Sequence, residues 1–196
     1  MVGLRVATQV CALWHQTYPM GDQMEKQKGF SLIELLIVVA IILIIAAIAI
    51  PNLLRAKISA NESSAVAATR TIYTAEVSYS STYGTGFTGT YAALGSAATP
   101  CTASSTNACL LDPILTTATA GGSKSGYSYA LAAAGGAGTT ASPNTTVEVN
   151  STPVTVGTTG QRAFCADESG VIRYNTTGGA VGTATGSCAA IALIIQ

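Results

Sequence analysis

The chain has 196 residues, of which 9% are charged, and its formal net charge at pH 7 is zero. A chain of this length favours one domain with appendages. The low and balanced charge gives no sign of a nucleic-acid-binding surface, which is normally basic. Much of the apolar character lies in one N-terminal run, so the rest of the chain has only a small core to build.

That apolar run covers residues 30–50, contains the single charge Glu34, and ends before Pro51. A helix of 21 residues rises roughly 30 Å, which is the hydrocarbon thickness of a bilayer. The run is longer than the apolar part of a cleaved secretory signal peptide. The basic residues Lys26 and Lys28 precede it and favour a cytoplasmic N-terminal flank. We therefore predict a membrane helix over 30–50 that sends the following chain out of the cytoplasm.

Glu34 is the unusual residue of this run. A carboxylate at the centre of a membrane helix costs about 2.5–3.5 kcal/mol on insertion scales, and less near the interface. An ionisable residue in such a place is a functional hypothesis by default. The alternative is that Glu34 lies at the interface and reaches for water.

The segment Lys28-Gly29-Phe30-Ser31-Leu32-Ile33-Glu34 and the apolar run after it resemble the N-terminal signature of type IV pilins and of the related pseudopilins of type II secretion systems. The similarity also extends over residues 46–54. The resemblance implies cleavage between Gly29 and Phe30 by a prepilin peptidase, N-methylation of Phe30, and assembly into a helical filament through packed apolar helices. It makes Glu34 and Pro51 candidate assembly residues.

One residue departs from the family pattern. Pilins of this type commonly carry a glycine where Leu43 stands, and in the family the stretch between that glycine and the proline can unwind in the filament. Leucine favours helix over glycine by roughly 0.8 kcal/mol. We therefore expect this stretch to resist unwinding.

Residues 1–29 are predicted to be a leader peptide that is removed. Residues 1–23 have no clear periodicity, whereas Met24 begins a compact six-residue leader, MEKQKG. We interpret residues 1–23 as a mis-assigned start, with translation beginning at Met24 or at Met20. The alternative is a genuine long leader.

Beyond Pro51 the chain has no glycine or proline until Gly84. We predict one helix from about Ser31 to Tyr83, with a bend at Pro51, whose second half, residues 51–83, is amphipathic and covers a sheet. The expected apolar face contains Leu54, Ile58, Ala65, Ile72 and Val77, and the charged residues assigned to other faces are Arg55, Lys57, Glu62 and Arg70.

Residues 84–196 are predicted to form a globular head. Its first part, 84–126, is interpreted as loops, with a short turn at 91–95 that buries Leu94. The stretch 84–89 matches GxGxxG formally, but a nucleotide-binding loop needs a strand before it and a helix after it. We therefore reject that interpretation.

Four later segments alternate like strands: 127–131, 146–150, 162–166 and 171–174, with a tight turn at 167–170. Together with the long helix they predict an α+β, type IV pilin-like fold, in which the helix packs on a four-stranded antiparallel sheet. The segment 160–175 also resembles C-terminal segments of bacterial pilin-like proteins.

Four of the five cysteines follow the predicted cleavage site, and Cys11 precedes it. An even number in an exported region indicates two disulfides, for which three pairings exist. We favour Cys101–Cys109 and Cys165–Cys188, because each pair closes a local loop. A zinc site is disfavoured, because no C-x2-C spacing occurs and the single histidine, His15, lies in the leader.

The sequence suggests no catalytic residues, no metal and no cofactor. Without a histidine in the predicted mature chain, Ser–His and Cys–His nucleophiles are unavailable. The adjacent carboxylates Asp167 and Glu168 are interpreted as solvated turn residues.

The leading hypothesis is therefore a non-enzymatic structural subunit of a type IV pilus-like surface filament. It would cross the inner membrane once, with its N-terminus inside, before assembly. Its partners would be the prepilin peptidase, the pilus assembly machinery and other copies of itself. The alternatives are a pseudopilin in a periplasmic filament, an uncleaved signal-anchored binding protein, and a secreted protein cut after Ala49. Major and minor subunits share this architecture, as do filaments for twitching, adhesion, DNA uptake and secretion.

Overall fold

The computed structural model describes residues 29–95, 100–119, 123–181 and 186–195. The interpretation of the leader and of the translation start concerns residues outside these ranges, apart from Gly29. The chain divides into two compact units, residues 1–44 and 45–196.

Helix α1 is continuous from Leu32 to Tyr83, through Pro51, which confirms the predicted long helix. It ends where Gly84 adopts a φ of +67°, a conformation that glycine reaches without steric cost. Within the described residues α1 is the one helix long and apolar enough to cross a membrane, judged by length and composition. Its most apolar window has a mean hydropathy of 3.3.

The second half of α1 packs against the sheet, as predicted, and Ala65 and Ile72 of the predicted apolar face are fully buried. Leu54 and Val77 are 57% and 42% exposed, so the predicted apolar stripe is wrong at both ends. The buried side chains are mostly small or polar, and they recur at intervals of three and four residues: Glu62, Ala65, Ala68, Thr69, Ile72, Ala75, Glu76 and Tyr79. The buried face of α1 is therefore marked by small and polar side chains more than by large apolar ones.

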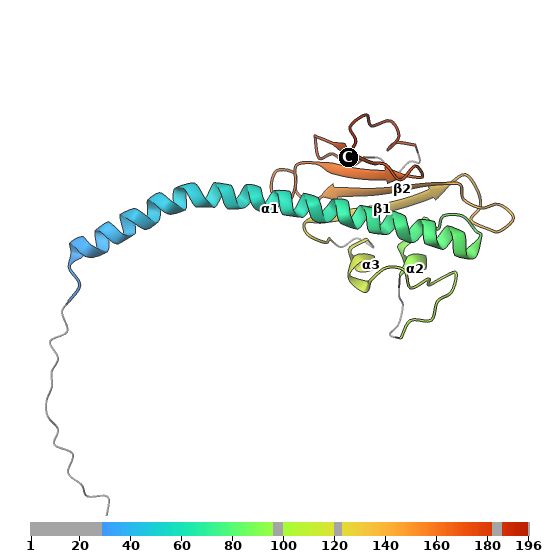
Figure 1. The fold of residues 1–196 in the computed structure, drawn as a ribbon, viewed down its shortest axis with the longest axis horizontal. Coiled ribbons are helices and arrows are strands. Elements are labelled where there is room, and N and C mark those ends of the chain that lie inside the picture. Colours follow the sequence, from blue (N-terminus) through green and yellow to red (C-terminus); the bar gives the residue numbers. More distant parts are fainter. Residues whose placement is uncertain (1–28, 96–99, 120–122, 182–185, 196) are drawn as a thin grey trace, which may run out of the picture. The chain divides into compact units, whose positions relative to one another are not determined.

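The sheet has four antiparallel strands in the order β1-β2-β3-β4. They are β1 (Tyr127–Ala134), β2 (Thr146–Pro153), β3 (Ala163–Asp167) and β4 (Ile172–Asn175). Each predicted strand is present, and β1 and β2 run three residues further than expected. Figure 1 shows α1 lying along this sheet. One hydrophobic core lies between the helix and the sheet. It contains side chains from α1, from the segment after it and from the strands, including Ile72, Tyr79, Leu94, Tyr127, Val149 and Phe164.

The segment between α1 and β1 is not only loop. It contains α2 (Tyr91–Leu94) and α3 (Pro113–Thr119). Leu94 is fully buried, as expected. Helix α3 was missed, although Asp112 and Pro113 are a typical start: the Asp112 Oδ1 accepts a hydrogen bond from Leu115 N at 2.7 Å, and proline suits the first helical position.

Two disulfides join Cys101 to Cys109 and Cys165 to Cys188. The second links β3 to the C-terminal segment, beside Val181 and Ile191 in a second apolar cluster. That segment then pairs with the outer edge of β4 through Tyr174 N to Leu193 O at 2.9 Å. The last residues therefore cover an edge that would otherwise expose unpaired backbone groups.

Candidate functional site

The start of α1 is built as a capping box. Glu34 Oε2 accepts a hydrogen bond from Ser31 N at 3.0 Å, and Ser31 Oγ accepts one from Ile33 N at 3.4 Å. Such reciprocal bonds satisfy backbone donors that a helix start leaves free. The role of Ser31 was not predicted, although the S-x-x-E pattern before an apolar run is a typical sign of a capping box. Glu34 thus has a structural partner within its own chain.

The two residues at the predicted cleavage bond precede this box. Gly29 and Phe30 lie outside the helix, and the Phe30 side chain is 85% exposed. A Cβ atom placed on Gly29 would meet no other atom within 4 Å. This bond is therefore open to another protein, and nothing within the chain itself demands glycine at this position.

The apolar half of α1 is exposed on all sides. Its large apolar side chains from Leu32 to Leu54 are between 46% and 79% exposed. An apolar surface this extensive is not stable in water and requires lipid or other protein as a cover. This segment is therefore a surface for a membrane or for further helices.

In the second half of α1, Glu62 forms the charged contact with the most hydrogen bonds. Its Oε2 accepts hydrogen bonds from Arg162 Nε at 2.9 Å and Nη2 at 2.7 Å. Its Oε1 accepts from Gln161 N at 2.9 Å and Arg162 N at 3.1 Å. Burial opposes ionisation of Glu62, but the hydrogen bonds from Arg162 and Gln161 and the Arg162 charge together lower its pKa. Glu62 therefore ties α1 to the start of β3 as an ionised group.

Glu76 is buried differently. It is 0% exposed, and its Oε2 accepts a hydrogen bond from Thr88 N at 2.8 Å. Burial raises the pKa of Glu76 to about 7, although hydrogen bonds from the Thr88 and Gly89 backbone act in the opposite direction. Its Oε1 and the hydroxyls of Tyr91 and Tyr129 are buried without a described partner. Glu76 therefore fixes the loop after α1 and titrates near neutral pH.

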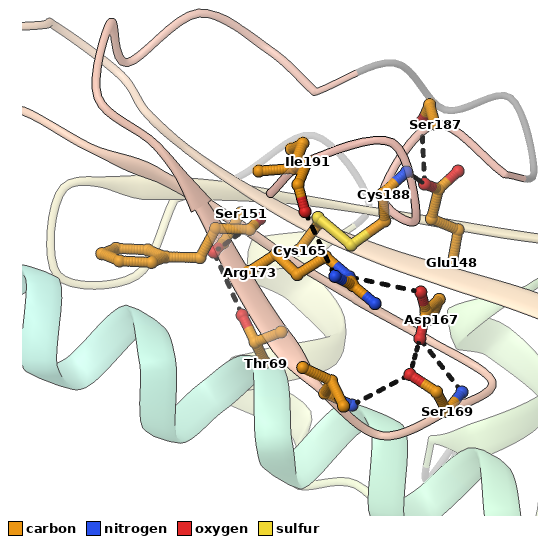
Figure 2. The surroundings of a disulfide bond; sticks show 12 residues. Thr69, Glu148, Ser151, Cys165, Asp167, Ser169, Arg173, Ser187, Cys188 and Ile191 are labelled. Carbon is orange, nitrogen blue, oxygen red and sulfur yellow. Dashed lines mark hydrogen bonds and ion pairs between the residues drawn. A yellow bond between two sulfur atoms is a disulfide. The ribbon is translucent and has the colours of Figure 1, made fainter. Parts of the chain in front are cut away.

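Two further acidic residues, Glu148 and Asp167, lie near the Cys165–Cys188 disulfide (Figure 2). Glu148 pairs with Asp167 across β2 and β3. Its Oε1 accepts hydrogen bonds from Ser187 Oγ at 2.7 Å and from Cys188 N. Burial raises the pKa of Glu148, and the neighbouring Asp167 charge adds to this.

Asp167 is not the solvated turn residue that the sequence suggested. It is 4% exposed, and its Oδ2 lies 3.6 Å from Arg173 Nε, while its Oδ1 accepts a hydrogen bond from Ser169 N at 3.0 Å. Of the two adjacent carboxylates, Glu168 is the exposed one, as expected. Among the described residues, no group of three or more His, Cys, Asp or Glu side chains could hold a metal ion.

Comparison with known proteins agrees with these features. A family profile described as the prokaryotic N-terminal methylation motif matches residues 24–50. The chain carries this motif, and its long N-terminal apolar helix followed by a four-stranded antiparallel sheet is consistent with the type IV pilin fold. The resemblance to type IV pilins that the sequence suggested is confirmed.

Two characterised relatives are type IV pilins. The chain is 48% identical over 54 residues to the type IV major pilin protein PilA of Myxococcus xanthus, covering 28% of this chain and 24% of that protein. It is 64% identical over 39 residues to the type IV wide pilus major component PilA4 of Thermus thermophilus, covering 20% of this chain and 30% of that protein. The matches thus span less than a third of either relative's length. No solved structure matches the chain.

Proposed function

We propose that the chain is a structural subunit of a type IV pilus-like surface filament. The observation that carries this proposal is the exposed apolar half of α1, which lies largely within the methylation motif and begins with a capping box. The similarity to two pilus components supports it. The subunit acts by assembly, without catalysis.

Processing comes first in the proposed pathway. A prepilin peptidase cuts between Gly29 and Phe30, and the new amino group of Phe30 is methylated. Before assembly the subunit crosses the inner membrane once, with its N-terminus in the cytoplasm, as the basic residues Lys26 and Lys28 favour. Residues 30–50 hold it in the bilayer, while residues 51–83 and the head at 84–196 lie outside.

Assembly then exchanges lipid for neighbouring helices around the apolar segment. Cleavage leaves a positive amine at Phe30, four residues before the acid of the membrane run, Glu34. In a low-dielectric bundle an unpaired charge costs several kcal/mol. Glu34 of one subunit therefore pairs with the Phe30 amine of its neighbour, and this pair sets the axial register while the apolar faces supply attraction without direction.

The capping box adds a second role for Glu34. Its hydrogen bond to Ser31 N holds the carboxylate at the first turn of α1, close in sequence to the amine. Glutamine can make the same capping hydrogen bond but carries no charge. A comparison of Glu34→Gln with Glu34→Ala therefore separates helix capping from charge pairing.

The alternative functions use the same N-terminus in different ways. A pseudopilin would form a periplasmic filament, and an uncleaved anchor would hold the head at the membrane as a binding protein. The two pilin relatives favour the surface filament over a pseudopilin. The methylation motif favours processing over an uncleaved anchor.

The test measures the ratio of sheared surface filaments to mature subunit retained in the membrane. We expect Glu34→Ala and Glu34→Gln to be inserted and cleaved normally and both to assemble poorly, because each leaves the amine without its partner. Wild-type filament yield from both variants, with no other subunit supplying the acid, would contradict the charge pair. Poor assembly of Glu34→Ala alone would assign Glu34 to helix capping.

A further inference from the structure

In the second half of α1, acidic and basic side chains lie on different sides of the helix. Its two acidic residues, Glu62 and Glu76, are buried against the head, whereas Arg55, Lys57 and Arg70 are exposed. The ion pairs in the described part of the chain are Arg162–Glu62 and Arg173–Asp167. The outer side of this half of the helix is therefore cationic, although the chain beyond Pro51 is formally neutral, with six basic and six acidic side chains.

Arg70 borders a groove of about 480 Å³ on one flank of α1. Small helix side chains leave this space open, and Leu110 also lines it. Besides Arg70, the helix residues are Ala67, Thr71, Thr74, Ala75 and Ser78. The hydroxyls of Thr71, Thr74 and Ser78 each donate to a carbonyl one turn earlier in the helix. The guanidinium of Arg70 is therefore the charged group that the groove offers to a partner.

The opposite charge lies on the turn between β3 and β4, residues 167–170. Glu168 is exposed, and its carboxylate has no described ion pair. The other described acids beyond Pro51 are buried, except Asp112, which caps α3. Two contacts hold the turn in place: Tyr73 Oη donates to Glu168 O at 3.1 Å, and Asp167 Oδ1 accepts from Ser169 N at 3.0 Å. The turn thus presents one acid from a fixed backbone.

The turn and the groove lie on different flanks of the same helix. Tyr73 contacts the turn, and Thr71, about 200° from Tyr73 around the helix axis, lines the groove. Arg70 lies between them, about 60° from Tyr73. Figure 1 agrees, since α2 and α3 lie to one side of α1 and the later strands to the other. Within one chain Arg70 and Glu168 form no described ion pair, so the turn of one copy and the groove of another offer each other complementary charges.

We propose that the 167–170 turn of one copy docks into the Arg70 groove of the next copy, with Glu168 meeting Arg70. Such a contact uses different surfaces on the two copies, so it can repeat from copy to copy, and it builds an open helical array when the rotation between copies does not close a ring. The inference rests on the proposed filament function and identifies a contact between heads within it. An exposed ion pair is weak by itself, but this one recurs in every subunit and fixes the lateral register of heads whose helices already associate.

Cross-linking on filaments tests the contact. In sheared filaments of the Arg70→Cys/Glu168→Cys variant, a short thiol-specific cross-linker should give a ladder of dimers, trimers and higher species. Each single-cysteine variant should give no ladder. The matched control Lys57→Cys/Glu168→Cys should also give none, because Lys57 lies about 20 Å from Arg70 along the helix. Filaments of the Arg70→Cys/Glu168→Cys variant that yield only monomer would overturn the proposal.

Charge reversal gives an independent measurement if the cysteine variant fails to fold. Arg70→Glu and Glu168→Arg should each reduce the filament yield severalfold, and the two changes together should restore it. Lys57→Glu combined with Glu168→Arg should not restore it. Wild-type yields from both single reversals would refute the Arg70–Glu168 contact. Absence of filaments from the wild-type chain would instead refute the filament function.

Discussion

Replacing Glu76 with glutamine should remove much of the pH dependence of the head's stability between about pH 5 and pH 8. Glu76 is fully buried on α1 and accepts a hydrogen bond from Thr88 N at 2.8 Å. Glutamine keeps the size of the side chain and an oxygen for that bond, but it does not ionise. The variant therefore isolates the titration of this residue from its packing.

The size of the pH-dependent change in the free energy of unfolding follows from the pKa of Glu76, which burial raises from 4.5 to about 7. Between these values the folded state holds a proton that the unfolded state has lost, so the free energy of unfolding falls as pH rises. Each pKa unit corresponds to about 1.4 kcal/mol, so the loss across this window is on the order of 3 kcal/mol. It is absent below pH 4.5 and complete above pH 7. Burial also raises the pKa of Glu148, so a smaller slope of the same sign should remain in the variant.

The assay is urea unfolding of the mature chain in detergent micelles, followed by tyrosine fluorescence at pH values from 5 to 8. The wild-type midpoint should decrease with pH, and the Glu76→Gln midpoint should decrease less. Glu168→Gln is the matched control, because Glu168 is exposed, and its slope should equal that of the wild type. Equal slopes for Glu76→Gln and the wild type would show that Glu76 does not titrate in this window.

Two further predictions concern processing and covalent linkage. A bulky residue at Gly29 should leave uncleaved precursor in the membrane, since the family resemblance implies a peptidase site that needs a small residue there; an immunoblot with normal maturation would contradict this. Replacing Cys165 and Cys188 with serine should lower the free energy of unfolding by about 3 kcal/mol, because the bond closes a loop with a sequence separation of 23 residues. An unchanged urea midpoint, or peptide mapping that links Cys165 to Cys101 or Cys109, would refute it.

The long helix and the strands were predictable because their causes are local. Between Leu32 and Tyr83 the chain contains no glycine and one proline, and the alternation in segments such as 127–131 marks a strand whichever neighbour it pairs with. Helix α3 was predictable as well, because Asp112 followed by Pro113 is a local signal for the start of a helix. The capping box of Ser31 and Glu34 was visible for the same reason.

The buried face of α1 could be found only in part in this way, at Ala65 and Ile72. Apolar periodicity placed Leu54 and Val77 inward and assigned Glu62 to another face, whereas Glu62 and Glu76 are buried. Their burial depends on donors far away in sequence or in a loop: Arg162 for Glu62, and the backbone of Thr88 for Glu76. A pattern that counts only apolar residues contains no information about such partners.

The filament function depends most directly on the chemistry of the mature N-terminus. Mass spectrometry of the N-terminal peptide, taken from protein sheared from the cell surface, measures it. The proposed function predicts a peptide that begins at Phe30 and carries a methyl group on its amine. A peptide that begins at Met24 or Met1 would indicate an uncleaved anchor, and one that begins at Ile50 a secreted protein; either would contradict the proposal.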